Sequence, residues 1–424
     1  MEKSCRIAFV SNYINHHQIP FCNAMHRLLQ GGFLFVQTEE MDRQRVQMGW
    51  HAAERPEYVR CFYEEPEECR QSILDCDVAL FGGTDDESYI EERLQAGKPV
   101  MRISERLYKT GQWKAVSPRG LRKKYHDHTR YRNSPVWLLC AGAYVASDFA
   151  IIRAYPGKMY CWGYFPETRH YDLDTLFGQK GYGEAKIPCL LWAARMIDWK
   201  HPELAVETAR FLREKGLDFH LDIIGDGELR TRTQALAEKY GLGDWVSFLG
   251  YQPPETVRRY MEQADVFLFT SDRQEGWGAV ANEAMNSACA LVADHMIGAV
   301  PYLVRQGENG LVYRDGKKEE LFAAAQRLVR DRAACRELGA AAYRTILGTW
   351  NAENAAERLL ELTESLTGIR WGQARPGQDG AGSCGARPGT GVGPTGRETA
   401  ENGRYVPCAP APVLSERFRK EKQD

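Results

Sequence analysis

The chain has 424 residues, a formal net charge of -2 and a hydrophobic fraction of 43%. Its length predicts two or three domains, and its composition is that of a globular protein with enough apolar residues for two cores. The near-neutral charge disfavours a protein that coats nucleic acid, because such a protein carries a strongly basic domain.

Twelve cysteines are spread along the chain, and no two of them form a C-x-x-C pair. This spacing disfavours a zinc ribbon or a thioredoxin-like motif and predicts reduced, mostly buried thiols, as in a cytoplasmic protein. The first residues lack the pattern of a secretory signal. The longest weakly apolar stretch, residues 136–147, is shorter than the ~18 residues of a membrane span. Any membrane contact is therefore expected to be peripheral.

Strand-like and helix-like segments alternate in the first half of the sequence. The predicted strands are residues 6–11, 33–37, 78–81 and 99–103, and the predicted helices are residues 19–29 and 88–95. This alternation predicts a parallel sheet flanked by helices.

A similar alternation starts again near residue 187. The predicted strands are residues 188–193, 219–224, 246–249, 266–269 and 290–293. The predicted helices are residues 202–215 and 277–287, with one or two more within residues 317–347. The segment 165–186, rich in glycine and charge, is the predicted junction.

The sequence thus predicts an α/β protein with two Rossmann-like domains, residues 1–168 and 187–348, followed by a C-terminal helix at 349–371. Residues 372–424 are rich in Gly, Pro, Ala, Thr and charged residues, so we expect a disordered tail that buries little apolar surface. Ligands of open α/β sheets bind at the carboxyl ends of the strands, which predicts a site between the domains.

The segment 271–287, SDRQEGWGAVANEAMNS, has the composition of a ligand-binding loop followed by a helix. Glycines allow the backbone to approach a ligand closely, and the amides of a helix N-terminus suit phosphate. Glu275 and Glu283 add carboxylates that can accept hydrogen bonds from hydroxyl groups. Spacing alone is equally consistent with a helix that carries two acids of no special role.

The same segment resembles the retaining glycosyltransferases of family 4, whose signature is two glutamates separated by seven residues in a pattern like E-G-x-G-x-x-x-x-E-A-M. The chain reads EGWGAVANEAM from Glu275 to Met285. The stretches LWAARMIDWK (191–200), IIGDGELR (223–230) and IGAVPYLVRQGENGLVY (297–313) also match that family in order and spacing. The resemblance covers roughly residues 188–347 and implies a GT-B-like fold, in which two Rossmann-like domains face a cleft.

The resemblance implies a role for each matching residue. Glu275 would contact the hydroxyls of the donor sugar, Glu283 the ribose, and Arg195 and Lys200 the diphosphate, whose negative charge grows as the glycosidic bond breaks. The remaining donor-binding residues would be Gly276, Trp277, Gly278, Ala279, Val280, Gly225 and Gly227. Family members generally use no catalytic metal, so neither a metal nor a cofactor is expected.

The first half departs from the family pattern in two places. The loop after the first strand reads NYINHHQ (12–18) without the usual glycine pair, and His16 and His17 are candidates for contact with a phosphate or an acceptor, or are plain polar loop residues. The stretch VMRISERLY (100–108) has Glu105 near the position of the family's histidine, either as a substitute polar group or as a structural residue.

Two further charged segments have competing interpretations. Asp85 and Asp86 are similar to the metal-binding acids of the other glycosyltransferase fold, which the two-domain pattern makes a weak alternative. The basic run RGLRKKYHDHTRYR (119–132) would face anionic lipid or a phosphate-bearing acceptor, or would be a solvated face.

The activity that these expectations imply is transfer of a hexosyl unit from a nucleotide diphosphate sugar to a carbohydrate or lipid-linked acceptor, with retention of configuration, as in the synthesis of surface polysaccharides. The protein would act in the cytoplasm or at the inner face of the membrane, without a nucleic-acid partner. A nucleotide-sugar epimerase and a catalytically silent sugar-nucleotide-binding protein are the alternatives.

Overall fold

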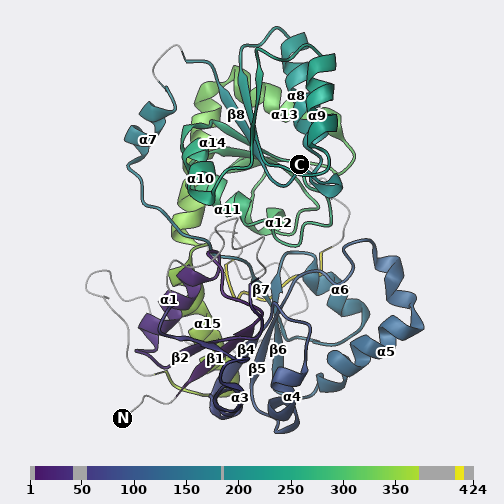
Figure 1. The fold of residues 1–424 in the computed structure, drawn as a ribbon, viewed down its shortest axis with the longest axis vertical. Coiled ribbons are helices and arrows are strands. Elements are labelled where there is room, and N and C mark those ends of the chain that lie inside the picture. Colours follow the sequence, from purple (N-terminus) through teal and green to yellow (C-terminus); the bar gives the residue numbers. More distant parts are fainter. Residues whose placement is uncertain (1–4, 42–54, 183–185, 372–405, 415–424) are drawn as a thin grey trace, which may run out of the picture.

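The computed structural model describes residues 5–41, 55–182, 186–371 and 406–414. Within these residues the chain forms two parallel sheets with helices on both faces, one in each half of the molecule (Figure 1). None of the described helices has the length and apolar character that crossing a membrane requires.

The first sheet has seven strands in the order β3-β2-β1-β4-β5-β6-β7, all of them parallel. Its strands are β1 (Ile7–Ser11), β2 (Phe33–Gln37), β3 (Val59–Cys61), β4 (Val78–Phe81), β5 (Val100–Ser104), β6 (Val136–Ala141) and β7 (Met159–Trp162). Its helices are α1 (Ile19–Leu28), α3 (Pro66–Asp75), α4 (Ser88–Gln95), α5 (Pro118–Asp127) and α6 (Val145–Ile151), with 3-10 turns η1 (Gln112–Val116) and η2 (Thr129–Tyr131). Four strands, β1, β2, β4 and β5, were predicted within one residue at each end.

The second sheet has six parallel strands in the order β10-β9-β8-β11-β12-β13. Its strands are β8 (Cys189–Ala193), β9 (His220–Ile224), β10 (Val246–Gly250), β11 (Val266–Phe269), β12 (Ala290–Asp294) and β13 (Gly310–Tyr313). Its helices are α8 (Pro202–Glu214), α9 (Arg230–Lys239), α10 (Pro254–Gln263), α11 (Val280–Asn286), α12 (Val300–Leu303), α13 (Lys318–Arg330) and α14 (Arg332–Gly348). The 3-10 turn η3 (Asp198–Lys200) precedes α8, and α7 (Leu173–Gln179) lies between the two sheets in sequence.

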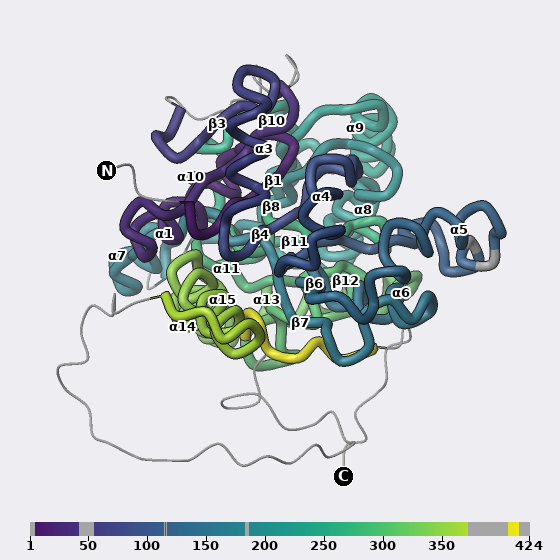
Figure 2. Tube along the Cα trace, turned by 90° about the horizontal axis from the view of Figure 1, so that it is seen from below, coloured from purple at the N-terminus to yellow at the C-terminus, as the bar shows by residue number. Residues whose placement is uncertain are grey.

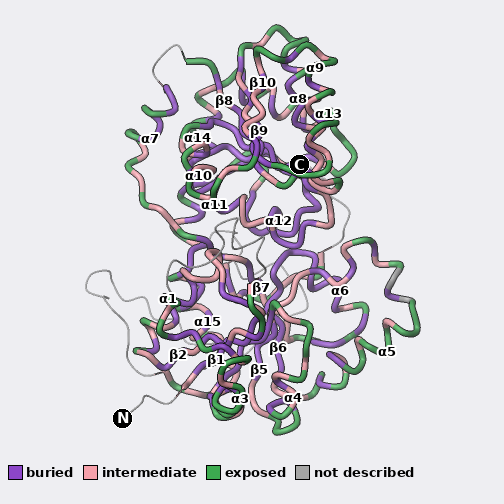
Figure 3. Tube along the Cα trace, viewed as in Figure 1, coloured by how far each residue is buried: buried purple, intermediate pink, exposed green. Residues whose placement is uncertain are grey.

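The central strands of both sheets are buried throughout, and the edge strands are partly exposed (Figure 3). Helices on both faces of a parallel sheet exclude water from both, so its strands consist of continuous apolar runs rather than alternating ones. This explains why runs such as VALF and VFLF could be assigned as strands from the sequence. The predicted fold class, two Rossmann-like halves, is confirmed.

The two halves meet through tight backbone contacts and an aromatic cluster. The Ala143 amide donates to the Gly298 carbonyl at 2.8 Å, and a Cβ on Gly142 would lie only 2.6 Å from the Gly276 oxygen. Beside this contact the Trp350 ring stacks between Phe165 and Tyr302, with ring centroids 6.1 and 5.8 Å away. Small residues and flat rings therefore hold the halves at close range.

The last helix, α15 (Ala352–Thr367), returns to the first half and packs against α1. Arg27 and Glu353 form an ion pair between the two helices at 3.6 Å, and the Arg6 guanidinium lies 4.7 Å from the Trp371 ring. The chain thus crosses between the halves twice, before β8 and after α14.

The prediction that all of residues 372–424 are disordered was wrong for residues 406–414. This segment runs antiparallel to β7, the edge strand of the first sheet (Figure 2). The Cys161 amide donates to the Ala409 carbonyl at 2.7 Å, and the Ala411 amide donates to the Met159 carbonyl at 3.0 Å. The edge strand supplies the segment with backbone partners, which composition does not reveal. The rest of the predicted tail lies outside the described residues.

Candidate functional site

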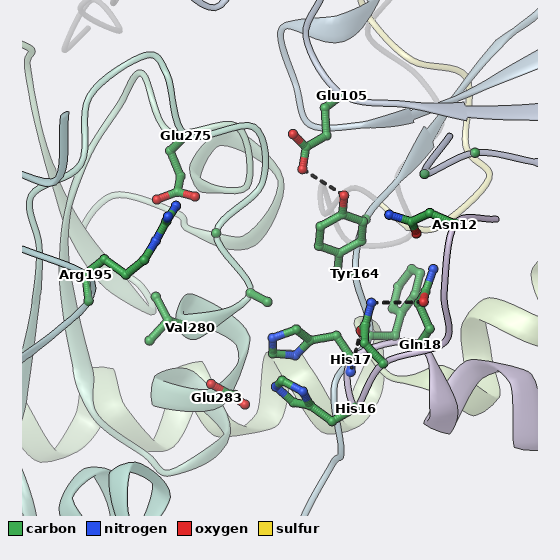
Figure 4. Close-up of a pocket in the computed structure, with 18 of the residues that line it drawn as sticks. Asn12, His16, His17, Gln18, Glu105, Tyr164, Arg195, Glu275, Val280 and Glu283 are labelled. Atoms are coloured by element: carbon green, nitrogen blue, oxygen red, sulfur yellow. Dashed lines mark hydrogen bonds between the residues drawn. The ribbon is translucent and has the colours of Figure 1, made fainter. Parts of the chain in front are cut away.

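A cleft of about 1190 Å³ lies between the two halves, at the carboxyl ends of strands from both sheets. Figure 4 shows side chains from both halves directed into it. The residues that line it and bear on the chemistry are Asn12, His16, His17, Glu105, Tyr164, Arg195, Trp199, Lys200, Gly225, Glu275, Gly278, Ala279, Val280 and Glu283. The sequence had predicted a site at this place.

Glu275 and Lys200 form an ion pair inside the cleft. Glu275 lies on the loop between β11 and α11, and Lys200 ends the 3-10 turn η3 after β8. Each side chain is only 11% exposed, so bulk water screens the pair weakly. A sugar hydroxyl or a phosphate entering here meets a carboxylate and an ammonium group held side by side.

Arg195 extends from the loop after β8 toward the Glu275 carboxylate (Figure 4). This loop is held from behind by the turn after β9: the Met196 amide donates to the Asp226 carbonyl at 2.8 Å. A Cβ on Gly225 would lie 1.8 Å from the Ala194 carbonyl oxygen, so only glycine allows the two loops to pack this closely. Gly225 thereby positions the segment that carries Arg195.

His201 adds a third positive charge next to Lys200. Its Nδ1 lies 2.9 Å from Glu203 and its Nε2 lies 3.5 Å from Asp272. Hydrogen bonds to Asp272 and Glu203 raise the pKa of His201 to about 10. The imidazolium is therefore charged at neutral pH, and the carboxylates of Glu203 and Asp272 balance its charge.

Glu283 lies on α11 and faces His16 and His17 of the first half (Figure 4). Burial raises the pKa of the Glu283 carboxyl, and the charges of Arg258 and His16 oppose that shift. Burial also lowers the pKa of His17 to about 4, so its imidazole is neutral at neutral pH. Among the described residues these three form a group whose nitrogen and oxygen atoms, all within 4.8 Å of one another, could hold a metal ion.

The loop that carries the two histidines is shaped by Asn15 rather than by glycine. The Asn15 side-chain oxygen accepts from the His17 amide at 3.0 Å, and its backbone oxygen accepts from the Gln18 and Ile19 amides. An asparagine that bonds nearby backbone amides in this way forms a turn without a positive backbone angle, and this turn leads into α1, whose N-cap is Gln18. The His16 and His17 rings lie 3.8 Å apart between centroids at the cleft surface.

Glu105 enters the cleft at the end of β5. Its carboxylate accepts from the Tyr164 hydroxyl at 2.8 Å and from Lys109 Nζ at 2.6 Å. A Cβ on Gly276 would lie 2.1 Å from Glu105 Oε2, so the glycine of the second half leaves room for a carboxylate of the first. Glu105 and Glu275 therefore approach the cleft from opposite halves.

Three residues predicted to bind the donor lie outside the cleft lining. Trp277 is fully buried, donates its indole N–H to Asn282 at 2.9 Å and packs near Trp350, because the loop turns its ring toward the interface of the halves. Gly276 lies under Glu105, and Gly227 packs against the Met196 backbone. The helix expected at residues 277–287 starts at Val280, and Gly278, Ala279 and Val280 line the cleft.

The two acids of the pair Asp85 and Asp86 lie in different surroundings. Asp85 borders the cleft, whereas the Asp86 carboxylate accepts from the Ser88 amide at 3.0 Å, near the start of α4. Neither belongs to a group of three possible metal ligands among the residues that the structure describes.

Sequence reasoning missed Asn12, Tyr164 and Trp199 as lining residues. Tyr164 follows β7 and reaches Glu105 from a loop with no motif of its own. Trp199 lies 4.4 Å from Lys200 Nζ and 6.0 Å from the Arg195 guanidinium, as an aromatic face for both cations. Its position within the LWAARMIDWK stretch was the one available signal.

Comparison with known proteins agrees with this geometry. Residues 181–345 match the family of glycosyl transferases group 1. That match contains Arg195, Lys200, Glu275 and Glu283, four of the residues that line the cleft from the second half. The finer assignment to family 4 is not part of this match.

The relatives found by sequence include glycosyltransferases of polysaccharide and lipopolysaccharide synthesis. The amylovoran biosynthesis glycosyltransferase AmsK of Erwinia amylovora is 29% identical over 42% of this chain and 44% of its own. The lipopolysaccharide core biosynthesis glycosyltransferase LpsE of Rhizobium meliloti is 29% identical over 43% of this chain and 51% of its own. The chain thus spans about half the length of these relatives. They give no support to the epimerase alternative.

Solved structures extend the likeness of fold to both halves. Anabaena Alr3699/HepE in complex with UDP has a TM-score of 0.63 at 14% identity and covers 85% of this chain and 100% of its own. The sucrose-phosphate synthase of Thermosynechococcus elongatus has a TM-score of 0.60 at 17% identity, and the match covers 86% of this chain and 99% of the synthase. The arrangement of the two halves is therefore that of GT-B proteins.

Proposed function

We propose that the protein is a retaining, metal-independent glycosyltransferase that moves a hexosyl unit from a nucleotide diphosphate sugar to a carbohydrate or lipid-linked acceptor. The observation that carries the proposal is the composition of one cleft. It holds the Lys200–Glu275 pair beside Arg195 and, on the following helix, Glu283. A nucleotide diphosphate sugar needs cations for its phosphates and carboxylates for its sugar and ribose hydroxyls.

The proposed donor orientation follows from the charges. The diphosphate would lie against Arg195 and Lys200, near the imidazolium of His201. The sugar would extend past Glu275 toward Glu105, and the ribose would lie at Glu283. Charge-assisted hydrogen bonds of this kind are shorter and stronger than neutral ones and fix the orientation of the ligand.

The reaction then needs little from the protein beyond position and charge. The bond between the anomeric carbon and the diphosphate oxygen breaks, and the diphosphate keeps the electron pair. The acceptor oxygen forms the new bond on the same face, and its proton passes to the leaving diphosphate. Fixed cations favour this step because they bind the charge that develops more strongly than the ground state.

A screen of nucleotide sugars tests this proposal. A donor that binds only the folded state raises the melting temperature by mass action, and a transferase then releases free nucleoside diphosphate from it. We expect at least one nucleotide hexose to do both. If a donor raises the melting temperature and no nucleoside diphosphate is released with any acceptor, the protein is a silent binder, and the enzyme proposal fails.

Activity is expected to persist in excess EDTA. Two fixed cations and the amides at Gly278–Val280 would neutralise the leaving group without a divalent ion. Turnover is measured before and after chelation and after magnesium or manganese is added back. Turnover that is lost with EDTA and recovered with the metal would contradict metal independence. The group His16, His17 and Glu283 would then be the candidate metal site.

A further inference from the structure

Three exposed large apolar side chains of the described chain lie on one outlying segment. Trp113 is 70% exposed, Tyr125 61% and Leu121 42%. The described residues include eight exposed large apolar side chains, and three of these eight lie within residues 113–125. Clustered exposed apolar groups indicate an interaction surface, whereas single ones are ordinary.

These side chains do not face the core of the first half. Leu121 and Tyr125 are four residues apart on α5 and are therefore neighbours on one side of the helix. Asp127 is buried, and Gly120 and Lys124 are partly buried, on the side that faces the protein. Figures 1 and 2 show α5 at the outer edge of the first half in both views. The apolar side of this helix is directed to the outside.

The same segment is strongly basic although the whole chain has a net charge of -2. Residues 119–132 contain six arginines and lysines and one acid, Asp127, which pairs with Lys123 at 2.9 Å. Arg119, Arg122, Lys123, Arg130 and Arg132 are exposed. Positive charge therefore surrounds the exposed aromatic and aliphatic side chains.

We propose that residues 112–132, the η1–α5 surface, dock on an anionic lipid bilayer. Tryptophan and tyrosine favour the interface between headgroups and acyl chains, and arginine and lysine bind the anionic headgroups. Nucleic acid is the weaker fit, because three exposed apolar groups on one short segment gain more from a lipid interface than from phosphates alone.

The surface lies next to the cleft. Lys124, on the inner side of α5, and Lys109 both line the cleft that would bind the donor. A bilayer held by the outer side of α5 would thus lie near the opening of the cleft on the first half. For the proposed reaction, this position favours a lipid-linked acceptor over a free carbohydrate. This assignment of the acceptor rests on the proposed function.

Vesicle binding by the full-length protein tests the docking proposal. We expect binding to vesicles of phosphatidylcholine mixed with phosphatidylglycerol, weakened by salt, and much weaker binding to phosphatidylcholine alone. Each basic residue near such a surface contributes roughly a five-fold factor. Arg119→Gln with Arg122→Gln should therefore weaken binding on the order of 30-fold. Trp113→Ser with Tyr125→Ser should weaken the binding that remains at high salt.

A matched control removes the same kinds of group elsewhere. Ile187→Ser with Arg330→Gln changes an exposed apolar and an exposed basic residue of the second half and should leave binding unchanged. Equal binding to both kinds of vesicle, no binding, or equal losses in the control and test variants would overturn the proposal. So would binding of a DNA duplex without binding of vesicles.

The docking result and the transferase result can fail separately. Vesicle binding is measured without a nucleotide sugar, so the docking proposal can hold even if the protein proves not to be a transferase. With an active donor, the Arg119→Gln, Arg122→Gln variant should lose transfer to a lipid-linked acceptor in anionic vesicles and keep its hydrolysis of the donor. Equal rates with the lipid-linked acceptor in variant and wild type would contradict the acceptor assignment.

Discussion

Replacing Lys200 with alanine is expected to lower kcat by about 10²–10³-fold while the protein stays folded. Lys200 is the cation paired with Glu275 inside the cleft. Without it the leaving diphosphate would lose one fixed positive charge at the stage when its own charge grows. Arg195→Ala should have a similar effect, because Arg195 lines the same cleft from the loop after β8 and points into it (Figure 4). Steady-state turnover with the active donor measures both.

The control for these variants is Lys215→Ala, which removes an exposed lysine just after α8. It should keep wild-type turnover. Circular dichroism and the melting temperature establish that each variant is folded. Near-wild-type turnover in folded Lys200→Ala and Arg195→Ala variants would show that the diphosphate does not lie against this pair.

Glu283→Gln is expected to raise KM by about 10- to 100-fold with little change in kcat, since charge-assisted hydrogen bonds contribute roughly 1.5–3 kcal/mol. The ribose does not react, so its contacts are similar in the ground and transition states and affect mainly binding. Glu275→Gln should lower kcat as well, because Glu275 would lie beside the centre where charge develops. Steady-state kinetics of both variants separates the two effects.

Glu238→Gln on the exposed side of α9 serves as the matched control and should leave both constants unchanged. If Glu283→Gln lowered kcat and Glu275→Gln only raised KM, the roles of the two residues would be exchanged. Equal losses in both would indicate a disrupted loop between β11 and α11.

The parallel sheets were predictable because burial on both faces produces continuous apolar runs with turn residues between them. The strands that were missed include β3, β6 and β7. β3 has only three residues, and β6 was treated as part of the weakly apolar stretch 136–147. Residues 406–414 could not be assigned, because their order depends on backbone partners in β7, more than 240 residues earlier.

The second half's side of the cleft was more predictable than the first half's. Arg195, Lys200, Glu275 and Glu283 come from motifs whose spacing is local, and the fold brings all four to one cleft. Motif membership did not indicate side-chain direction, however, and the bulky Trp277 packs in the interface of the halves instead of the cleft. Its ring is held there by Asn282 and the neighbouring aromatic residues.

The first half's side depends on contacts that no local pattern encodes. Glu105 meets Tyr164, which is 59 residues later, and lies against Gly276 of the other half. His16 and His17 reach Glu283 only because the halves pack at close range through Gly142, Gly276 and Gly298. Sequence could name these residues as candidates, and their juxtaposition required the folded chain.

Calorimetric titration of the nucleoside diphosphate of the active donor tests the central claim most directly. This ligand keeps the ribose and the phosphates and lacks the sugar. Glu283→Gln should weaken its binding by about 10- to 100-fold, and Glu275→Gln should leave its affinity close to that of the wild type. Unchanged affinity in Glu283→Gln, or a loss confined to Glu275→Gln, would contradict the placement of the ribose at Glu283.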